Sequence, residues 1–429
     1  MPFTDEFYDY IIVGGGLQGG LLTLAIRYHN PDATILLIER GENVGGNHTW
    51  SFHPEDVPDS AKPWIESLVS NRWSEYFVRF PGFERRLHLP YASINSKHFA
   101  DVVESAFPRF KSQSSRNEPS SDDLTVPAIT NRIPLHRSEV ETADRQFCRA
   151  SSSRLLTNTE VKVLTSNAVM TSEGITYSCD TAIDCRGLSV EDIPHGGGCG
   201  YQKFVGFEFE LSSDWPETHP VIMDACRSQA EGFRFMYTLP FSPRRILIED
   251  TQFSDHPRLE RADCYQSVIA FLRAKTDSDW SIVREESGCL PMPYTRRGMP
   301  CLSDSVRGGY AGGWFHAATG YSFPLAVRFA EAVGSAAPGQ LTGAVAALIK
   351  ENRFPAKFSR FLNRLLFRLV KADSRWGLFR RFYRVLSERE ISRFYAHRIT
   401  VADACRIVVG RPPFGMTPLR FANSLLTEK

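Results

Sequence analysis

The chain has 429 residues, of which 42% are hydrophobic and 23% are charged, a composition typical of soluble globular proteins and unlike that of disordered or fibrous chains. Its length exceeds the needs of one small core and predicts a large enzyme with two lobes. The formal net charge of +1 argues against a nucleic-acid partner, and nine cysteines without a CxxC pair indicate neither a metal site nor a disulfide framework.

The start of the chain and its hydropathy give two further expectations. The first ten residues, MPFTDEFYDY, contain no basic segment followed by an apolar run, so we expect no export signal. No later stretch approaches the roughly 18 uncharged apolar residues of a membrane-spanning helix. The sequence therefore predicts a cytoplasmic protein.

The N-terminal region has the pattern of a nucleotide-binding βαβ unit. Residues 8–13 (YDYIIV) predict a strand, residues 17–27 have helical spacing of leucine and isoleucine, and residues 33–38 (ATILLI) predict a second buried strand. The turn from Gly14 to Gly19 has the pattern GxGxxG, whose glycines let backbone amides approach a pyrophosphate at the positive end of a helix. The pattern predicts dinucleotide binding; a turn that serves only helix packing is the alternative.

Two features after this turn support a dinucleotide site, and the second favours FAD over NAD. Glu39 lies 20 residues beyond Gly19, at the end of the second strand, where a carboxylate can hydrogen-bond the adenosine ribose. The glycine pair Gly45–Gly46 follows closely, which is typical of flavoproteins more than of NAD dehydrogenases. We therefore expect contacts with FAD from Gly14, Gly16, Leu17, Gly19, Glu39, Arg40, Gly46, Asn47, His48 and Thr49.

The middle of the chain divides into a polar segment and a β-rich segment. Residues 111–123 (KSQSSRNEPSSDD) are serine-rich and lack aromatic residues, so we expect a flexible insertion over residues 111–153. Residues 204–253 contain successive short runs with alternating aromatic and polar positions, which predict a sheet with one wet face. Such a sheet could wall a substrate cavity.

Two later motifs have the composition of cofactor-binding turns. Residues 175–177 and 181–184 predict a strand that leads into an Asp-x-Arg-Gly turn, a feature of FAD sites, although an ordinary β-turn remains the alternative. Residues 312–324 (GGWFHAATGYSFP) form a glycine-rich loop that opens a helix, whose N-terminus could face the phosphates and the flavin ring. These motifs predict FAD contacts from Asp184, Arg186, Gly187, Gly312, Gly313, Gly320 and Tyr321.

The predicted fold is α/β. A Rossmann-like FAD-binding domain would take residues 1–110, 154–200 and 286–345. A mainly antiparallel β substrate lobe would take residues 201–285, and a helical C-terminal region residues 346–429.

The C-terminal region is strongly basic. From Lys357 to Arg398 the chain has twelve basic residues against three acidic ones. The runs FLNRLLFRLV and WGLFRRFYRVL interleave arginine with large apolar residues, as in helices that lie on an anionic membrane surface. A solvated basic face of a packed helical lobe is the alternative.

The motifs together resemble the bacterial lycopene β-cyclases of carotenoid synthesis. The pieces that carry this resemblance are VGGGLQGGL, GGNHTWSFH, INSKHF, DCRG, IMDA, FRFMYTLPFSPRRILIEDT, GCLPM, FHAATGYSFPLAV and RFYAHRITVADACRIVVGRPP. The resemblance implies closure of the linear ψ-ends of lycopene into β-rings, through γ-carotene to β-carotene. It also implies FAD that is reduced by NAD(P)H and no net redox change.

Ring closure needs a proton donor and exclusion of water, and a carboxyl group in an apolar pocket suits the first task because desolvation keeps it protonated. Glu249 and Asp250 end the apolar run 246–248, and only one of them can face a cavity because successive strand residues point to opposite faces. Glu249 matches the acidic motif of the family and is the expected acid and base, with Asp250 supporting it from the other face. Glu208 and Asp224 are secondary candidates.

Aromatic residues and two rival functions complete the expectations. A tunnel could be lined by Phe204, Phe207, Phe233, Phe235, Tyr237 and Trp314, which would offer ring faces to a cation. The rival enzyme is an FAD monooxygenase or dehydrogenase of an isoprenoid or polyene. The rival without catalysis is a flavin-bound carotenoid carrier.

Overall fold

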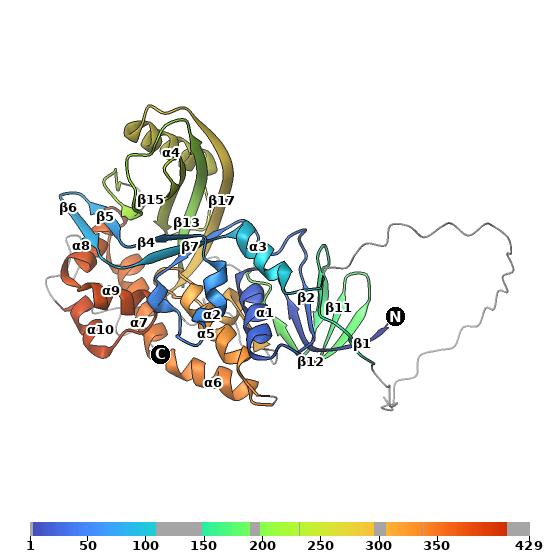
Figure 1. The fold of residues 1–429 in the computed structure, drawn as a ribbon. Coiled ribbons are helices and arrows are strands. Elements are labelled where there is room, and N and C mark those ends of the chain that lie inside the picture. The colour runs from blue at the N-terminus through green and yellow to red at the C-terminus, as the bar shows by residue number, and fades with distance from the viewer. Residues whose placement is uncertain are drawn as a thin grey trace, which may run out of the picture.

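The computed structural model describes residues 3–108, 148–188, 198–230, 232–295, 306–337 and 339–409. In Figure 1 a sheet that contains β1 (Phe3–Val13) and β12 (Thr176–Asp184) lies on the right, a second sheet with helix α4 (Arg261–Lys275) lies at the top, and the C-terminal helices lie on the left. Most of the predicted insertion, residues 111–147, lies outside the described residues, as does the segment 410–429.

The first sheet is of the Rossmann type, which confirms the predicted fold class. Strand β1 lies between β12 and β2 (Ile35–Ile38), and the three strands run parallel. The residues predicted as two pieces around 175–184 form the single strand β12. The remaining strands are β8 (Cys148–Arg149), β9 (Arg154–Leu156), β10 (Val161–Leu164), β11 (Ala168–Thr171) and β18 (Val306–Arg307), in the order β10-β11-β12-β1-β2-β9 with β18 beside β12 and β8 beside β1.

Helix α1 (Leu17–His29) connects β1 to β2 and packs against α5 (Phe323–Gly334). The two helices approach so closely that a Cβ on Gly334 would lie 2.9 Å from the Ala25 Cβ. Helix α3 (Ser96–Ser105) covers α1 from the other side, and a Cβ on Gly20 would lie 2.3 Å from the Phe99 ring. The small residues of α1 therefore let three helices share one core.

The second sheet has seven strands in the order β17-β13-β16-β15-β14-β5-β6. Their neighbours are antiparallel except for the parallel pair β14 and β5, so the predicted antiparallel character is confirmed. The strands are β5 (Tyr76–Phe80), β6 (Phe83–Leu87), β13 (Cys199–Leu211), β14 (Val221–Asp224), β15 (Phe233–Ser242), β16 (Arg245–Ser254) and β17 (Trp280–Pro293). Strands β5 and β6 come from outside the predicted lobe of residues 201–285.

The two faces of this sheet pack against different partners. Helix α4 covers one face, which we call the α4 face, through a core that includes Val205, Phe207 and Ile248. The opposite face, which we call the Glu249 face, packs near Phe233 and Leu239 against the C-terminal helices. A three-stranded sheet of β3 (Thr49–Phe52), β7 (Tyr91–Asn95) and β4 (Asn71–Trp73) joins the two larger sheets.

The C-terminal region is helical, as predicted. Its elements are α6 (Leu341–Glu351), α7 (Arg353–Arg364), the π-helix η5 (Leu365–Leu369), α8 (Trp376–Val385), α9 (Glu388–Tyr395) and α10 (Val401–Val408). Short helices also occur at α2 (Lys62–Ile65), η1 (Pro54–Asp56), η2 (Glu66–Leu68), η4 (Tyr310–Gly312) and η6 (Ala372–Ser374). Within the described residues, no helix has the length and apolar character needed to cross a membrane.

Some apolar residues of the two basic runs face inward, whereas Val385 of the second run is 37% exposed, so contact of these runs with a membrane stays a prediction. Leu366 and Phe367 are buried in the core beneath the Glu249 face. Phe379 of α8 stacks on Phe233 of the sheet at 4.1 Å between ring centroids. The physical reason is that a sheet face rich in phenylalanine offers these side chains a dry partner.

Candidate functional site

The predicted cofactor motifs converge at the carboxyl ends of the parallel strands. Gly14 follows β1 with φ +103°, and a Cβ there would lie 2.6 Å from the Cys185 carbonyl oxygen. Beyond it, Gly16 has open space on its Cβ side, and helix α1 begins there without a side-chain cap. The first amides of α1 are therefore available to an anion, as a pyrophosphate site requires.

Glu39 lies beside this turn at the end of β2. Its Oε2 accepts a hydrogen bond from the Gly15 amide at 2.6 Å, and its Oε1 accepts one from the Gly41 amide at 2.8 Å. The carboxylate is thus held at the edge of the glycine turn, where the hypothesis of ribose binding requires it. The adjacent Arg40 is exposed.

The loop from Gly45 to Thr49 links the turn to the seven-stranded sheet. Gly45 donates its amide hydrogen to the Gly15 carbonyl at 2.7 Å, and Gly46 has φ +61° with open space on its Cβ side. At the other end, Thr49 donates its amide hydrogen to Glu286 Oε2 of β17 at 2.8 Å. Asn47 Nδ2 donates to the Glu285 carbonyl oxygen at 2.5 Å, and burial lowers the pKa of His48.

The Asp184 and Gly312 motifs lie on the other side of the turn. Arg186 donates to Asp184 through Nε at 2.9 Å and Nη2 at 2.8 Å, which fixes the start of the turn at Gly187. Gly308 donates its amide hydrogen to the Asp184 carbonyl at 2.8 Å and so ties β12 to the loop at Gly312. In this loop Gly313 has φ +78° and Gly320 has φ +67°, and a Cβ on Gly320 would meet Leu290 of β17 at 2.8 Å.

Glu249 lies on the seven-stranded sheet in a row of four cross-strand neighbours. Across β16 it pairs with Tyr237 of β15 on one side and with Gly206 of β13 on the other, and Gly206 in turn pairs with Glu286 of β17. Because directly opposed residues share a face, these four lie together on the Glu249 face. Gly206 has no side chain, so the side chains of Glu249 and Glu286 approach each other over it, within 3.3 Å of where its Cβ would stand.

The environment of Glu249 favours its neutral form. Desolvation, followed by the negative charge of Glu286, raises the pKa of Glu249 to about 8, against an opposing hydrogen bond that Thr251 Oγ1 donates to Glu249 Oε1 at 2.5 Å. Among the described residues, Glu249 forms no salt bridge. The side chain is half-buried, so it is not fully closed off by the described residues.

Two other carboxylates on this face are paired with arginine. Glu286 Oε2 accepts a hydrogen bond from Arg284 Nη1 at 2.7 Å. Glu208 accepts one from Arg284 Nε at 2.8 Å and one from Arg245 Nε at 2.6 Å. The sequence analysis placed Glu208 among the candidates but missed Glu286 and Arg284. The signal was the glycine inside a strand pattern, because such a glycine marks a close approach.

Asp250 and Asp224 lie on the α4 face. Asp250 is fully buried and accepts hydrogen bonds from Arg234 Nε at 2.8 Å and Nη2 at 2.5 Å. Asp224 pairs across the strands with Met236, which is itself opposite Asp250, and its Oδ2 lies 3.8 Å from Arg79 Nη1. The structure therefore does not bring Asp224 next to Glu249. It does place Asp250 on the opposite face, as strand alternation predicts.

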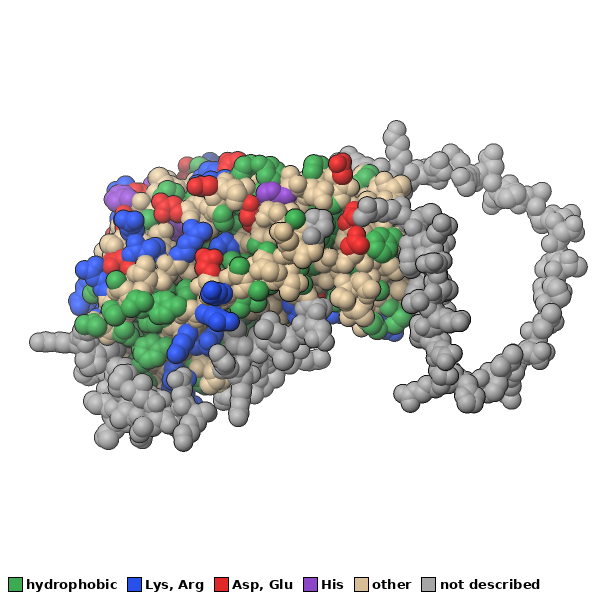
Figure 2. Space-filling view, turned by 90° about the horizontal axis from the view of Figure 1, so that it is seen from below, with side chains coloured by type: hydrophobic (Ala, Val, Ile, Leu, Met, Phe, Trp, Pro, Cys, Tyr) green, Lys and Arg blue, Asp and Glu red, His purple; other side chains and the backbone are tan. Residues whose placement is uncertain are grey.

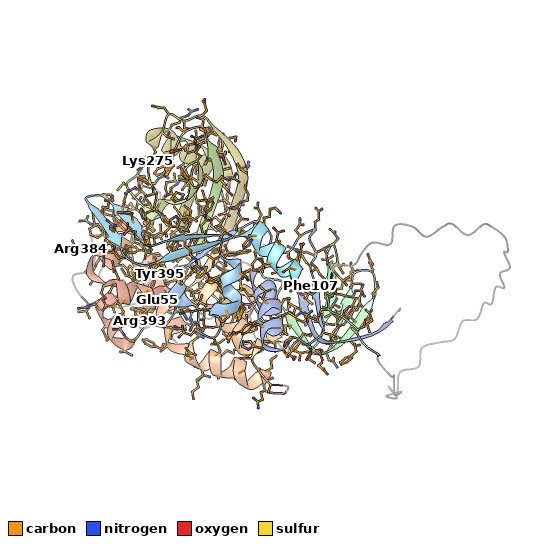
Figure 3. The ribbon with its side chains drawn as sticks, in the orientation of Figure 1. Glu55, Phe107, Lys275, Arg384, Arg393 and Tyr395 are labelled. Carbon is orange, nitrogen blue, oxygen red and sulfur yellow. The ribbon has the colours of Figure 1, made fainter. Side chains whose placement is uncertain are left out.

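A cluster of tyrosine hydroxyls lies beside Glu249. Tyr237 donates to Ser51 Oγ at 2.8 Å and lies 3.2 Å from the Tyr91 hydroxyl. Further along, Tyr321 donates to Asp56 Oδ2 at 2.8 Å, so the glycine-rich loop is connected to η1. Figure 3 labels Tyr395, whose ring lies 6.3 Å from that of Tyr321. Tyr237 and Tyr321 were predicted as a tunnel residue and an FAD contact, whereas Tyr91 and Tyr395 were not predicted, because they come from a separate strand and helix.

The predicted aromatic tunnel is corrected at two positions. Phe207 packs against Tyr265 of α4 at 5.4 Å between ring centroids, so it lies on the α4 face and cannot line the same cavity as Glu249. Trp314 packs against Phe329 of α5, in the core that α1, α3 and α5 share. Phe204, Phe233, Phe235 and Tyr237 lie on the Glu249 face. In the described part of the chain, no group of three His, Cys, Asp or Glu side chains could hold a metal ion.

The comparisons with known proteins agree with this geometry. A lycopene β-cyclase from Pantoea ananas is 33% identical, with 95% of each chain covered. A p-nitrophenol 4-monooxygenase from Pseudomonas putida has the same fold at a TM-score of 0.59 and 11% identity, with 92% of this chain and 99% of that chain covered. A probable FAD-dependent monooxygenase from Pseudomonas aeruginosa has a TM-score of 0.52 at 12% identity, with coverages of 86% and 98%. The family model described as lycopene cyclase protein matches residues 9–124 and 134–421, and the chain belongs to this family.

Proposed function

We propose that this enzyme is a flavin-dependent lycopene β-cyclase, which converts the linear ψ-ends of lycopene to β-rings, through γ-carotene to β-carotene. The observation that carries the proposal is the half-buried Glu249, a carboxyl group without a basic partner among the described residues, whose cross-strand row reaches Glu286 and through it Thr49 of the loop beside the nucleotide-type turn. A carboxyl group with a pKa of about 8 is largely protonated at neutral pH, so it can donate a proton to an alkene.

The proposed cofactor is FAD, with NAD(P)H as its reductant. The residues fit this group: the uncapped start of α1 suits the pyrophosphate, Glu39 suits the ribose, and Gly46 has open space on its Cβ side. When bound in its reduced form, FAD would supply negative charge that stabilises a carbocation without net transfer of hydride. The same cofactor is named for a monooxygenase of this fold.

In the proposed reaction Glu249 is both acid and base. It donates its proton to the terminal double bond of the ψ-end, and the resulting tertiary cation is attacked by the next double bond, which closes the ring. Loss of a ring proton to the Glu249 carboxylate regenerates the acid and leaves an alkene, so no electrons are gained or lost. Phe204 and Tyr237 would offer ring faces to the cation, and Asp250 would support β16 from the α4 face.

The decisive test gives the purified protein, loaded with reduced FAD, lycopene in liposomes and resolves the products by chromatography. We expect β-carotene, with many turnovers for each reduced flavin. Consumption of NAD(P)H in proportion to product would instead indicate a monooxygenase or dehydrogenase. Unchanged lycopene with bound FAD would contradict the cyclase and favour a carotenoid carrier.

We also propose peripheral contact between the C-terminal helices and an anionic membrane, because the substrate is dissolved in lipid. The support comes from exposed apolar side chains that lie among exposed arginines: Phe354 of α7 is 40% exposed, Val385 of α8 is 37% exposed and Val401 of α10 is 65% exposed. Figure 2 shows basic side chains beside hydrophobic patches on the left part of the face viewed from below. This combination suits an interfacial surface.

Vesicle flotation tests this contact. We expect the protein to float with vesicles that contain anionic lipid, and Val401→Asp to weaken the association because a charge replaces an apolar contact. Val163→Asp is the matched control, because Val163 is 46% exposed on β10 of the other domain. Equal flotation of all three proteins would contradict a docking surface at α10.

A further inference from the structure

We propose that Glu286 is a positioning residue that keeps the proton on Glu249, acting across the space that Gly206 leaves between the two side chains. The inference rests on the proposed function and deepens it, because it assigns a role to a second carboxyl group of the same site. Glu286 itself would neither donate nor accept the transferred proton.

Gly206 lies between Glu249 and Glu286 on the sheet. Gly206 is the cross-strand neighbour of both Glu249 and Glu286 on a central strand. A Cβ at this position would lie 3.3 Å from the Glu249 Cβ and 3.2 Å from the Glu286 Cγ. Any larger residue would therefore fill the space through which the two carboxyl groups interact, and glycine is unfavourable in a strand interior without such a reason.

The contacts of Glu286 carry the second step. Its side chain is only 4% exposed, and its Oε2 accepts hydrogen bonds from the Thr49 amide at 2.8 Å and from Arg284 Nη1 at 2.7 Å. These two donors hold the Glu286 carboxyl group in one position. Glu249 has only the Thr251 hydroxyl as a side-chain partner in the described residues. The two carboxyl groups therefore differ in their partners: an arginine and an amide bind Glu286, and a hydroxyl binds Glu249.

The surrounding charges preserve this division. Tyr237 faces Glu249 from β15, and His48 lies in the loop before β3, where burial lowers its pKa and favours the neutral ring. Two arginines lie on this side: Arg284 binds both Glu286 and Glu208, and Arg245 binds Glu208. The charge of Glu286 is the second cause, after desolvation, of the raised pKa of Glu249.

This division also assists the return of the proton. After Glu249 protonates the alkene, two carboxylates face each other across Gly206, and their repulsion favours recovery of a proton by Glu249. The ring proton of the cyclised cation is the available one. Glu286 would thus make Glu249 an effective base in the second half of the reaction without any change in its own protonation.

Two substitutions that should shift the pKa of Glu249 in opposite directions test the proposal in the FAD-loaded protein. Glu286→Gln removes the negative charge, so the pKa of Glu249 should fall by about one unit, and the alkaline limb of the cyclisation rate should move down with it. Arg284→Gln removes the cation and leaves the Glu286 charge uncompensated. The pKa of Glu249 and the alkaline limb of the cyclisation rate should therefore both move to higher pH. The pKa of Glu249 is read without substrate from its carboxyl stretch by infrared difference spectroscopy, with Glu249→Gln identifying the band.

The controls separate this role from a structural one. Glu285→Gln changes the neighbouring residue, whose side chain pairs with Arg261 instead, and should leave both midpoints unchanged. Glu286→Asp keeps the negative charge, so the pKa of Glu249 in this variant should lie close to that of the wild type. Shifts of Glu286→Gln and Arg284→Gln in the same direction, or no shift in either, would overturn the proposal; if only one variant folds, the sign of its shift decides. The infrared titration needs no turnover. If the Glu249 pKa shifts as expected but no β-carotene forms, the proposed cyclase function is contradicted and the proposed role of Glu286 is not.

Discussion

The two faces of the seven-stranded sheet give adjacent carboxyl groups opposite environments. Glu249 faces glycine, tyrosine and a second glutamate, and the described residues provide it with no cation. Asp250, the next residue, is held by Arg234 at 2.5 Å and lies 3.5 Å from Arg227 beneath α4. Asp250 therefore belongs to a buried ion-pair network, whereas Glu249 lies beside an anion and a hydroxyl, and burial together with that anion favours the protonated form of Glu249.

The largest effect is expected at Glu249. Glu249→Gln should retain FAD but reduce cyclisation by about 100-fold or more, because an amide cannot supply the proton. Product chromatography and the flavin absorbance of the purified variant measure the two quantities. Turnover near the wild-type rate would show that Glu249 does not supply the proton, and neither face would then have a carboxyl group assigned to the reaction.

The next effect is expected at Asp250 and concerns stability. Asp250→Asn should lower the free energy of unfolding by about 3 kcal/mol, because it removes the buried carboxylate that the partly buried Arg227 and Arg234 share, and Arg234 keeps its ion pair with the exposed Asp263. Activity per folded molecule should stay within a few-fold of the wild type. Urea unfolding provides the measurement, with Glu285→Gln as the control, whose more exposed ion pair contributes less than about 1 kcal/mol. A loss of activity without a loss of stability would assign Asp250 to the reaction itself.

The pH dependence of stability should differ between the wild type and Glu249→Gln. The pKa of Glu249 is about 8 in the folded protein, against about 4.3 in an unfolded chain. The stability that this group contributes is fully present below the unfolded value and is lost as pH rises through the folded value, by up to about 1.4 kcal/mol per pH unit between them. Urea unfolding from pH 5 to pH 9 should therefore show the wild type losing stability relative to the variant. Parallel curves would mean that the pKa of Glu249 is not raised.

The smallest effect is expected at a hydroxyl on each face. Tyr237→Phe removes the hydrogen bond to Ser51, and Thr238→Val removes the bond that Thr238 accepts from the Val221 amide. Each should cost about 1 kcal/mol of stability. Only Tyr237→Phe should also slow cyclisation, by less than about ten-fold, because Tyr237 lies beside Glu249. Equal changes in the cyclisation rate of the two variants would contradict the assignment of cyclisation to the Glu249 face.

The sequence alone determined the nucleotide-type part of the molecule. Gly14, Gly16 and Gly19 stand at fixed spacing between a strand and a helix, so one local pattern contains the turn, the helix start and the position of Glu39. Strand alternation likewise determined that Glu249 and Asp250 face opposite ways. The alternation did not reveal which of them faces the cavity; the choice of Glu249 came from its resemblance to the family motif.

The tertiary structure decided everything that depends on pairing between distant strands. The register of β13 places Gly206 between Glu249 and Glu286, although 43 and 80 residues separate it from them along the chain. The same pairing gives Arg284 to Glu208 and Glu286 and leaves Glu249 without a cation, which no local pattern encodes. It also turns Phe207 toward α4 and buries Leu366 and Phe367 of the basic region, because a side chain packs against whichever surface the fold brings near it.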